Sequence, residues 1–230
     1  DGIDQLVWQR ADGTGAVKVL AREPGLPSSW SPDGRQLALC RPLNPNRFKD
    51  FRTWIATIAG DTVTLQPTQE EEAWPEFSPD GRWLAYGTAG ASGHAEVYVR
   101  PYPGPGPRQQ VSLNGGGMPA WSSSGRELFF VTAPDTGRGI FHADGQMMAV
   151  DVRTGPTLEL GRPHPLFTYS PEVTGLGGFP VRPYAVAPDG QFFYAMRVAP
   201  RSPRAPITQI RLVTNWLDEL KTRVAAGQAK

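Results

Sequence analysis

Short apolar runs alternate with polar turns along most of the chain, and one turn recurs. Residues 30–39 read WSPDGRQLAL and residues 77–86 read FSPDGRWLAY. Related stretches follow at 121–130, WSSSGRELFF, and at 186–195, VAPDGQFFYA. Each copy starts at an aromatic residue or Val, passes through a turn containing Gly, and continues as an apolar run. This pattern predicts one β-hairpin per copy.

The residues of the turn explain its shape. Pro presets φ near about −65° at the first turn position, Asp suits the second, and Gly accepts the positive φ that follows. The third copy has Ser123-Ser124 in place of Pro-Asp but keeps Gly125. The turn glycines stand at positions 34, 81, 125 and 190, so the copies are 47, 44 and 65 residues apart. The last interval therefore carries an insertion.

A second kind of hairpin lies between these turns. Its strands are expected at 6–9 with 17–20, 54–58 with 63–65, 96–100 with 109–111, and 147–152 with 157–160. Two hairpins per period make four strands, and repeated four-stranded units of this length are the blades of a β-propeller. The blades are expected at about 28–66, 74–112, 119–160 and 182–214, after a half-blade at 3–20.

Four and a half blades do not close a ring cleanly. We therefore expect an all-β propeller of four to five four-stranded blades that is part of a larger ring, with the inner strands of the half-blade upstream of residue 1. A compact five-bladed closure is the alternative. Open sheet edges could also pair with another copy, and the sequence leaves the oligomeric state open.

The end of the chain predicts a short helix. Residues 1–214 are expected to form the blades, and residues 215–230 an amphipathic helix and tail. Trp216, Leu217, Leu220 and Val224 share one apolar face, and Asn215 can cap the first turn. We expect this face to cover the edge of the last blade; the alternative is a helix that binds a partner.

These residues resemble a known family. The four turns are similar to those of the WD-repeat-like propeller of the TolB type. Residues 96–104, EVYVRPYPG, 147–150, MMAV, and 215–220, NWLDEL, resemble the C-terminal propeller of bacterial serine/threonine protein kinases. The resemblance implies a sensory or protein-binding module that follows a kinase domain. It also favours a periplasmic or otherwise extracytoplasmic location, although the residues themselves leave the compartment unknown.

Composition narrows the choice of partners. The 23 basic and 22 acidic residues leave a net charge of +1, which gives no strong positive electrostatic field to attract nucleic acid. No apolar run is long enough to predict a membrane segment in this chain. The single cysteine, Cys40, excludes an internal disulfide or a cysteine-cluster metal site, and it follows an apolar strand. We expect a buried, inert thiol.

No catalytic motif emerges. The glycine-rich loop, His-Arg-Asp loop and Asp-Phe-Gly site of kinases are missing, as is the Gly-x-Ser-x-Gly elbow of hydrolases. His94, His142 and His164 lack metal-ligand spacing. The recurrent Asp33, Asp80 and Asp189 are explained by turn capping. We therefore expect no catalytic residue, no cofactor and no metal.

Three long loops are candidates for binding, because propeller loops are where these folds make contacts. Residues 41–52 form a basic tract, residues 101–108 are rich in Pro, and residues 161–184 mix Gly with aromatic residues expected to be exposed. The candidate contact residues are Arg47, Phe48, Lys49, Arg52, Tyr102, Arg108, His164, Tyr169, Arg182 and Tyr184.

The sequence as a whole favours a non-catalytic binding or sensory module for a protein or peptide, as the C-terminal part of a larger bacterial signalling or envelope protein. One alternative is that the parent protein is a serine/threonine kinase. This chain would then be called a kinase as part of that protein, although it contains none of the catalytic motifs. The other is a propeller hydrolase or lyase with a site at the mouth of the channel.

Overall fold

In the computed structural model, the chain divides into two compact units, Asp1–Val198 and Ala199–Lys230. The structure describes residues 5–21, 25–44, 47–60, 62–68, 71–89, 95–132, 144–155, 157–170, 182, 184–189 and 193–195. All of these lie in the first unit. Their regular structure consists of strands, with no helix among them, so the prediction of an all-β protein is confirmed. The predicted helix at 215–230 lies outside the described residues.

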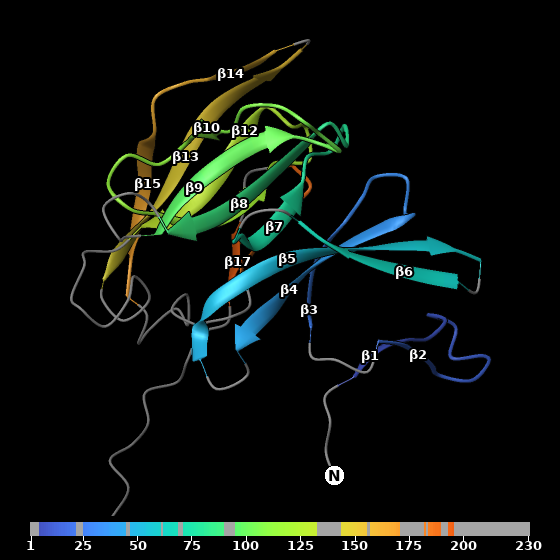
Figure 1. Cartoon of the computed structure of the whole chain (residues 1–230). Helices are drawn as coiled ribbons and strands as arrows, with labels where there is room; N and C mark the ends of the chain where they lie inside the picture. Colours follow the sequence, from blue (N-terminus) through green and yellow to red (C-terminus); the bar gives the residue numbers. More distant parts are fainter. Residues whose placement is uncertain are drawn as a thin grey trace, which may run out of the picture. The chain divides into compact units, whose positions relative to one another are not determined.

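Two sheets have four antiparallel strands in sequence order (Figure 1). The first sheet consists of β3 (Leu26–Trp30), β4 (Gln36–Asn44), β5 (Arg47–Ala59) and β6 (Thr62–Pro67). The second sheet consists of β7 (Ala73–Phe77), β8 (Trp83–Ala89), β9 (Ala95–Pro101) and β10 (Gln109–Gln110). Each sheet therefore contains the two kinds of hairpin that the sequence predicts.

The third sheet has a fifth strand. It consists of β11 (Gly117–Trp121), β12 (Glu127–Thr132), β13 (Gly145–Thr154), β14 (Leu158–Leu160) and β15 (His164–Tyr169). One edge of the long strand β13 is shared, because β14 pairs with residues 152–154 and β15 with residues 145–149. The part of the insertion that was expected to be a loop thus includes an edge strand.

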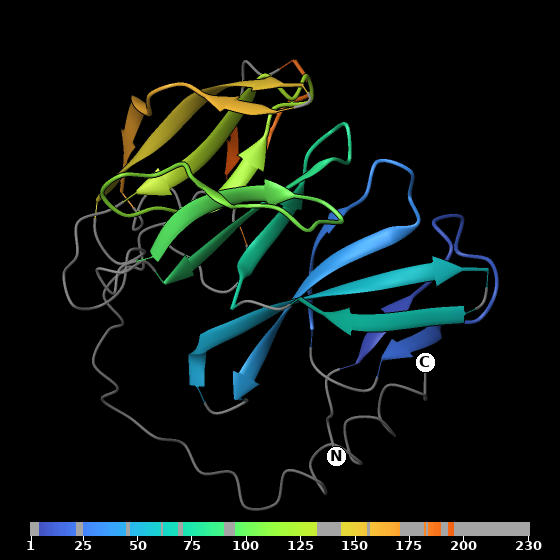
Figure 2. The same cartoon turned by 45° about the horizontal axis from the view of Figure 1, so that its top comes forward.

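Two hairpins complete the described strands. The N-terminal hairpin consists of β1 (Leu6–Trp8) and β2 (Lys18–Ala21). The last hairpin consists of β16 (Tyr184–Val186) and β17 (Phe193–Ala195). Figure 2 shows the same strands from a second direction.

The repeated turn has the same hydrogen bonds in successive copies. In the first copy the Ser31 hydroxyl donates to Asp33 Oδ1 at 2.6 Å, and the Arg35 N–H donates to the same oxygen at 3.1 Å. Ser78 and Asp80 repeat this arrangement in the second copy at 2.6 and 3.1 Å. The turn glycines 34, 81 and 125 have φ values of 68°, 72° and 68°, as predicted. The fourth turn glycine, 190, lies outside the described residues.

The third copy keeps the turn without a carboxylate. The hydroxyl oxygens of Ser122 and Ser124 lie 3.1 Å apart, and the Arg126 N–H donates to Ser124 Oγ at 3.3 Å. The backbone N–H of Gly125 still donates to the carbonyl of Ser122 at 2.9 Å. Serine therefore replaces aspartate as the acceptor, through longer and uncharged hydrogen bonds.

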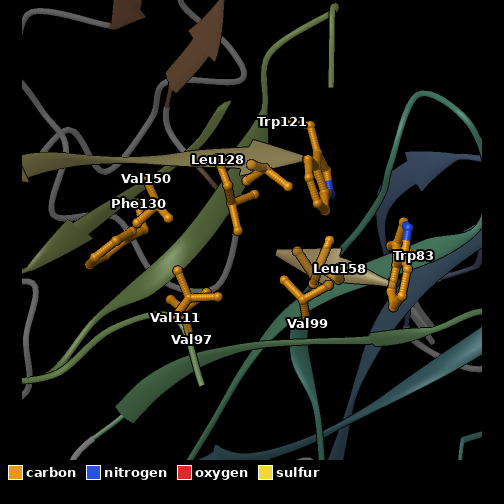
Figure 3. Packing of buried hydrophobic residues seen from close by; sticks show 11 residues of the cluster. Trp83, Val97, Val99, Val111, Trp121, Leu128, Phe130, Val150 and Leu158 are labelled. Carbon is orange, nitrogen blue, oxygen red and sulfur yellow. The ribbon is translucent and has the colours of Figure 1, made fainter. Parts of the chain in front are cut away.

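The sheets pack face to face through apolar side chains. Between the second and third sheets, the largest cluster brings residues of β8 and β9 against residues of β11, β12 and β13 (Figure 3). Its labelled members are Trp83, Val97, Val99, Val111, Trp121, Leu128, Phe130, Val150 and Leu158. Each fully buried large apolar side chain contributes about 1.5–3 kcal/mol, so this interface is a main source of stability.

The inner strands β7 and β11 share an unusual backbone feature. Trp74 and Met118, each followed by Pro, have φ values of 51° and 56°. Both side chains enter the same apolar cluster, with Tyr184. Gly87 makes room for this, because a Cβ at that position would lie 2.7 Å from the Trp74 ring. The positive φ thus accompanies burial of two large side chains.

Candidate functional site

Arg182 and Glu76 form a largely buried ion pair where β7, β11 and β16 meet. Arg182 precedes β16, and its Nη1 lies 3.0 Å from Glu76 Oε2 on β7. The same guanidinium donates to the carbonyl of Pro119 on β11 at 2.8 Å and to that of Tyr184 at 3.1 Å. Burial raises the pKa of the Glu76 carboxyl, and Arg182 counteracts that rise. The guanidinium therefore connects β7, β11 and β16.

Tyr184 is part of the same arrangement. Its side chain is 4% exposed, and its hydroxyl donates to the carbonyl of Met118 at 2.5 Å. Burial raises the pKa of this hydroxyl well above its usual range. Both Arg182 and Tyr184 were expected to be contact residues in a loop, but the structure uses their polar atoms to hold inner strands together.

A second ion pair joins Glu72 to Arg100 within the second sheet. The Nε and Nη2 atoms of Arg100 donate to the two carboxylate oxygens of Glu72 at 2.7 and 3.3 Å. Glu72 is 1% exposed, and its carbonyl accepts a hydrogen bond from Thr53 of the first sheet at 3.1 Å. A bidentate pair of this kind is rigid and directional. Sequence reasoning missed it, because the partners are separated by 28 positions without a motif.

A third buried acid, Glu96, stabilises the chain after β10. It accepts hydrogen bonds from the Ser112 hydroxyl and, at 3.0 Å, from the Gly115 N–H. Ser112 Oγ in turn accepts from the Val97 N–H at 2.8 Å. The carboxylate therefore orders residues 112–115 against β9.

The three buried carboxylates are used in contacts within the chain. Glu72, Glu76 and Glu96 direct their carboxylates at groups of the same chain. The described residues contain no group of three or more His, Cys, Asp or Glu placed to hold a metal ion. His164 is exposed on β15, whereas His94 and His142 lie outside the described residues. Cys40 is buried as expected, and burial raises the pKa of its thiol to about 12.

The basic tract at 41–52 is a hairpin and not the expected loop. The strand β4 extends to Asn44 and β5 begins at Arg47, with Arg41 opposite Arg52. Arg47, Phe48 and Lys49 thus start a strand. Arg52 is half-buried, and its Nε has no hydrogen-bond partner in the described part of the chain.

Pro101 ends β9, and the rest of the Pro-rich stretch, residues 102–108, is irregular, as expected. Tyr102 is half-buried, with its ring packed edge-on against Phe77 at 4.9 Å between centroids. Its hydroxyl donates to Gln36 Oε1 of the first sheet at 2.9 Å, and burial raises its pKa. Arg108 is exposed and lies 4.6 Å above the Tyr98 ring. Tyr102 therefore joins two sheets, while Arg108 remains at the surface.

The third candidate patch divides into an exposed and a buried part. On β15, His164, Leu166 and Phe167 are exposed, and the two apolar residues are 42% and 41% accessible. Tyr169, at the end of the strand, is 2% exposed and belongs to the apolar cluster of the third sheet. Burial raises its pKa to about 12. The expectation of exposed aromatic residues is therefore wrong for Tyr169 and Tyr184.

Large exposed apolar side chains occur on several of the described strands. Apart from Leu113, they lie on β15, on β1 or β2, in the segment between β1 and β2, or at the end of β3. The members are Val7, Trp8, Val17, Val19, Trp30, Leu113, Leu166 and Phe167. We call His164, Leu166 and Phe167 the β15 edge. None of the described residues forms a helix that is long and apolar enough to span a membrane.

Known proteins resemble this chain in structure. No family model and no curated protein matches its sequence. A protein identified as TolB from Agrobacterium tumefaciens has a TM-score of 0.55 at 20% identity, covering 80% of this chain and 63% of that chain. TolB from Acinetobacter baumannii has a TM-score of 0.51 at 17% identity, covering 84% and 42%.

Successive four-stranded antiparallel sheets that share one repeated turn, each packed against the next sheet along the chain, define a β-propeller. The similar solved structures support the same fold. More particularly, the fold is that of a TolB-like β-propeller. Identities of 20% and 17% show the fold alone. The chain spans less than two thirds of the length of either TolB structure.

Proposed function

We propose that this chain is a non-catalytic module that binds a protein or peptide, and that it is the C-terminal part of a larger bacterial signalling or envelope protein. The observation that carries the proposal is a contrast between two kinds of side chain. Buried acids and the cations beside them are used in contacts within the chain, whereas the β15 edge presents apolar side chains to solvent. This division suits a rigid scaffold with a contact strand.

The β15 edge can accept an extended peptide as an additional strand. Among the described residues, β15 pairs with β13 alone, so its other edge has no strand partner there. A peptide strand would gain main-chain hydrogen bonds along this edge, and contacts with Leu166 and Phe167 would supply selectivity. His164, exposed on the same strand, adds an imidazole that can donate or accept a hydrogen bond. Of the surface candidates, Arg108 lies on a separate segment and serves as a second proposed contact.

Selection from a displayed peptide library tests the binding function. We expect extended, apolar peptides whose affinity falls at least tenfold in Leu166→Asp, because a charge would be placed against the apolar peptide. Leu113→Asp is the matched control, since Leu113 is 68% exposed on another segment. Peptides that bind both variants equally well, or a library that yields no binder, would argue against the β15 edge.

The second part of the proposal concerns the larger protein to which this chain belongs. The resemblance to propellers of bacterial serine/threonine kinases supports an upstream kinase domain and an extracytoplasmic location for this part. The complete gene sequence tests both points directly. A kinase domain followed by a membrane span would support them, and a parent with neither feature would refute them.

A further inference from the structure

Two arginines lie opposite each other on neighbouring strands of the first sheet. Arg41 on β4 pairs with Arg52 on β5 in the antiparallel register, so their side chains leave the sheet on the same face. Both residues are half-buried. Like charges that lie directly opposite each other destabilise a sheet, and partial burial strengthens their repulsion. The pair therefore lowers the stability of the hairpin unless a negative charge joins it.

The guanidinium of Arg52 also has a buried N–H without an acceptor. No hydrogen-bond partner of its Nε is found in the described part of the chain. A donor that is removed from water without a partner loses its hydration and gains nothing in return. Such groups are rare in folded proteins, and an ion or a ligand is a common reason for one. One anion beside Arg52 would remove both unfavourable features.

Arg41 is held in position by its neighbours. The central carbon of its guanidinium lies 4.4 Å from the centre of the Trp54 ring. A Cβ at Gly25 would lie 3.3 Å from Cγ of Arg41, so the glycine leaves room for the arginine stem. Guanidinium groups keep their charge at all ordinary pH values. An oriented positive charge therefore lies next to the arginine that lacks an acceptor.

Basic residues are concentrated on this sheet. The four strands carry four basic residues and one acidic residue, which gives them a charge of +3 in a chain whose net charge is +1. The rest of the chain is therefore net negative. The charged residues of the sheet are Arg41, Arg47, Lys49, Asp50 and Arg52.

Other partly buried arginines show what Arg52 lacks. Arg100 lies 2.7 Å from Glu72, and Arg182 lies 3.0 Å from Glu76. None of the ion pairs found among the described residues includes Arg52. An anion from solution would thus complete at Arg52 what carboxylates of the chain complete at the other two positions.

We infer that Arg41 and Arg52 form a binding site for a phosphate group. The two guanidinium groups together carry +2, and a phosphate group carries about −1.5 to −2 near neutral pH, whereas one carboxylate would leave half of the charge unpaired. A guanidinium binds two phosphate oxygens through parallel N–H···O hydrogen bonds. The phosphate also supplies the acceptor that the Arg52 Nε–H lacks. Free phosphate and a small phosphate monoester present the same oxygens to this site.

The stability of Arg52→Met distinguishes a ligand site from a structural arginine. In chloride buffer the variant should be at least as stable as the parent chain, because methionine removes the unpaired N–H and the repulsion from Arg41. Sodium phosphate at constant ionic strength should raise the unfolding temperature of the parent chain and leave that of Arg52→Met unchanged. Thermal unfolding measures both effects. A variant that is less stable by the same amount in the two buffers would overturn the inference.

NMR of the arginine Nε–H groups measures the binding of inorganic phosphate directly. The signals of Arg41 and Arg52 should shift together during the titration. Binding should be at least tenfold weaker in Arg41→Gln and in Arg52→Gln. Arg126→Gln is the matched control, because it removes one positive charge from an exposed turn and should bind phosphate as the parent chain does. Equal weakening in Arg126→Gln would overturn the inference in favour of attraction by net charge alone.

Two further ligands identify the source and the chemistry of the anion. Glycerol 3-phosphate that binds more tightly than inorganic phosphate would support the site with a phosphorylated small molecule as its ligand, and equal affinities would support it with free phosphate. Malonate at the same ionic strength presents two carboxylates instead. Binding of malonate as tight as that of phosphate would overturn the assignment to a phosphate group.

Discussion

The interface between the second and third sheets differs from the one between the N-terminal hairpin and the first sheet. In the former, Trp83 and Trp121 are both buried, and a hydrogen bond from Trp121 reaches the preceding sheet. In the latter, Trp30 is half exposed although it lies in the same motif. The motif therefore determines the hairpin, whereas the neighbouring sheet determines whether its aromatic residue contributes to the core.

The largest expected effect comes from truncating the buried member of this comparison. Trp121→Ala should lower the free energy of unfolding by about 3–5 kcal/mol, because it leaves a cavity between two sheets. Trp30→Ala should lower it by less than about 1 kcal/mol, since half of that side chain already contacts water. Urea unfolding of both variants measures the difference, and equal losses would contradict the comparison.

Buried and exposed ion pairs extend the contrast. Arg182→Ala should destabilise by about 2–3 kcal/mol, because Glu76 and two backbone carbonyls lose their partner in a largely buried position. Arg10→Ala should leave the free energy of unfolding nearly unchanged, because Arg10 and Asp12, whose Nη2 and Oδ2 atoms lie 2.9 Å apart, form an exposed pair. Thermal and urea unfolding test this, and similar losses would mean that Arg182 does not hold the inner strands together.

The turns offer a test of moderate size. Gly34→Val and Gly81→Val should each destabilise by at least about 1 kcal/mol, because a β-branched residue resists positive φ. At Gly34 no atom lies within 4 Å of the added Cβ, so a loss of stability in this variant comes from backbone strain and not from a steric clash of the Cβ. Gly155→Val, where no positive φ is imposed, is the control. Unchanged unfolding in both turn variants would refute this role of φ.

The local features of the fold were predictable from sequence, because their determinants lie within a few residues. Ser31, Asp33 and Gly34 determine a turn by themselves, and copies of it identify the repeat. The strand β15 was not predicted, because its buried and exposed residues do not alternate as they do in a typical strand. It is identified as a strand by its pairing with β13 in the structure.

The site was predicted less well for a related reason. Glu72 with Arg100 and Glu76 with Arg182 are brought together by the packing of strands that are distant in sequence. Arg182 and Tyr184 looked like loop residues because Pro and Gly surround them. Their burial depends on β7 and β11, which no local pattern reveals.

The smallest expected effect concerns the third turn. Ser124→Asp should restore the charged acceptor of the other copies and stabilise by less than about 1 kcal/mol at pH 7. Hydrogen bonds from Ser31 and the Arg35 N–H lower the pKa of Asp33. A carboxylate whose folded pKa is lowered stabilises above its unfolded pKa of about 4, and this gain is lost as pH falls through the folded value.

Unfolding of Ser124→Asp and the parent chain at successive pH values from 7 downward therefore provides the measurement. The two proteins should differ most at pH 7, and the difference should shrink as the pH falls through the lowered pKa of the folded carboxyl. A gain that does not shrink on acidification would show that hydrogen-bond geometry, and not the charge of the carboxylate, stabilises this turn.

The central claim is that a neighbouring sheet buries the aromatic residue of the motif at Trp121 and leaves it half exposed at Trp30. Fluorotryptophan labelling with a soluble paramagnetic agent tests it most directly, with the signals assigned through Trp30→Phe and Trp121→Phe. We expect strong broadening of the Trp30 signal and little change in that of Trp121. Equal broadening of the two signals, or protection of Trp30, would contradict the account.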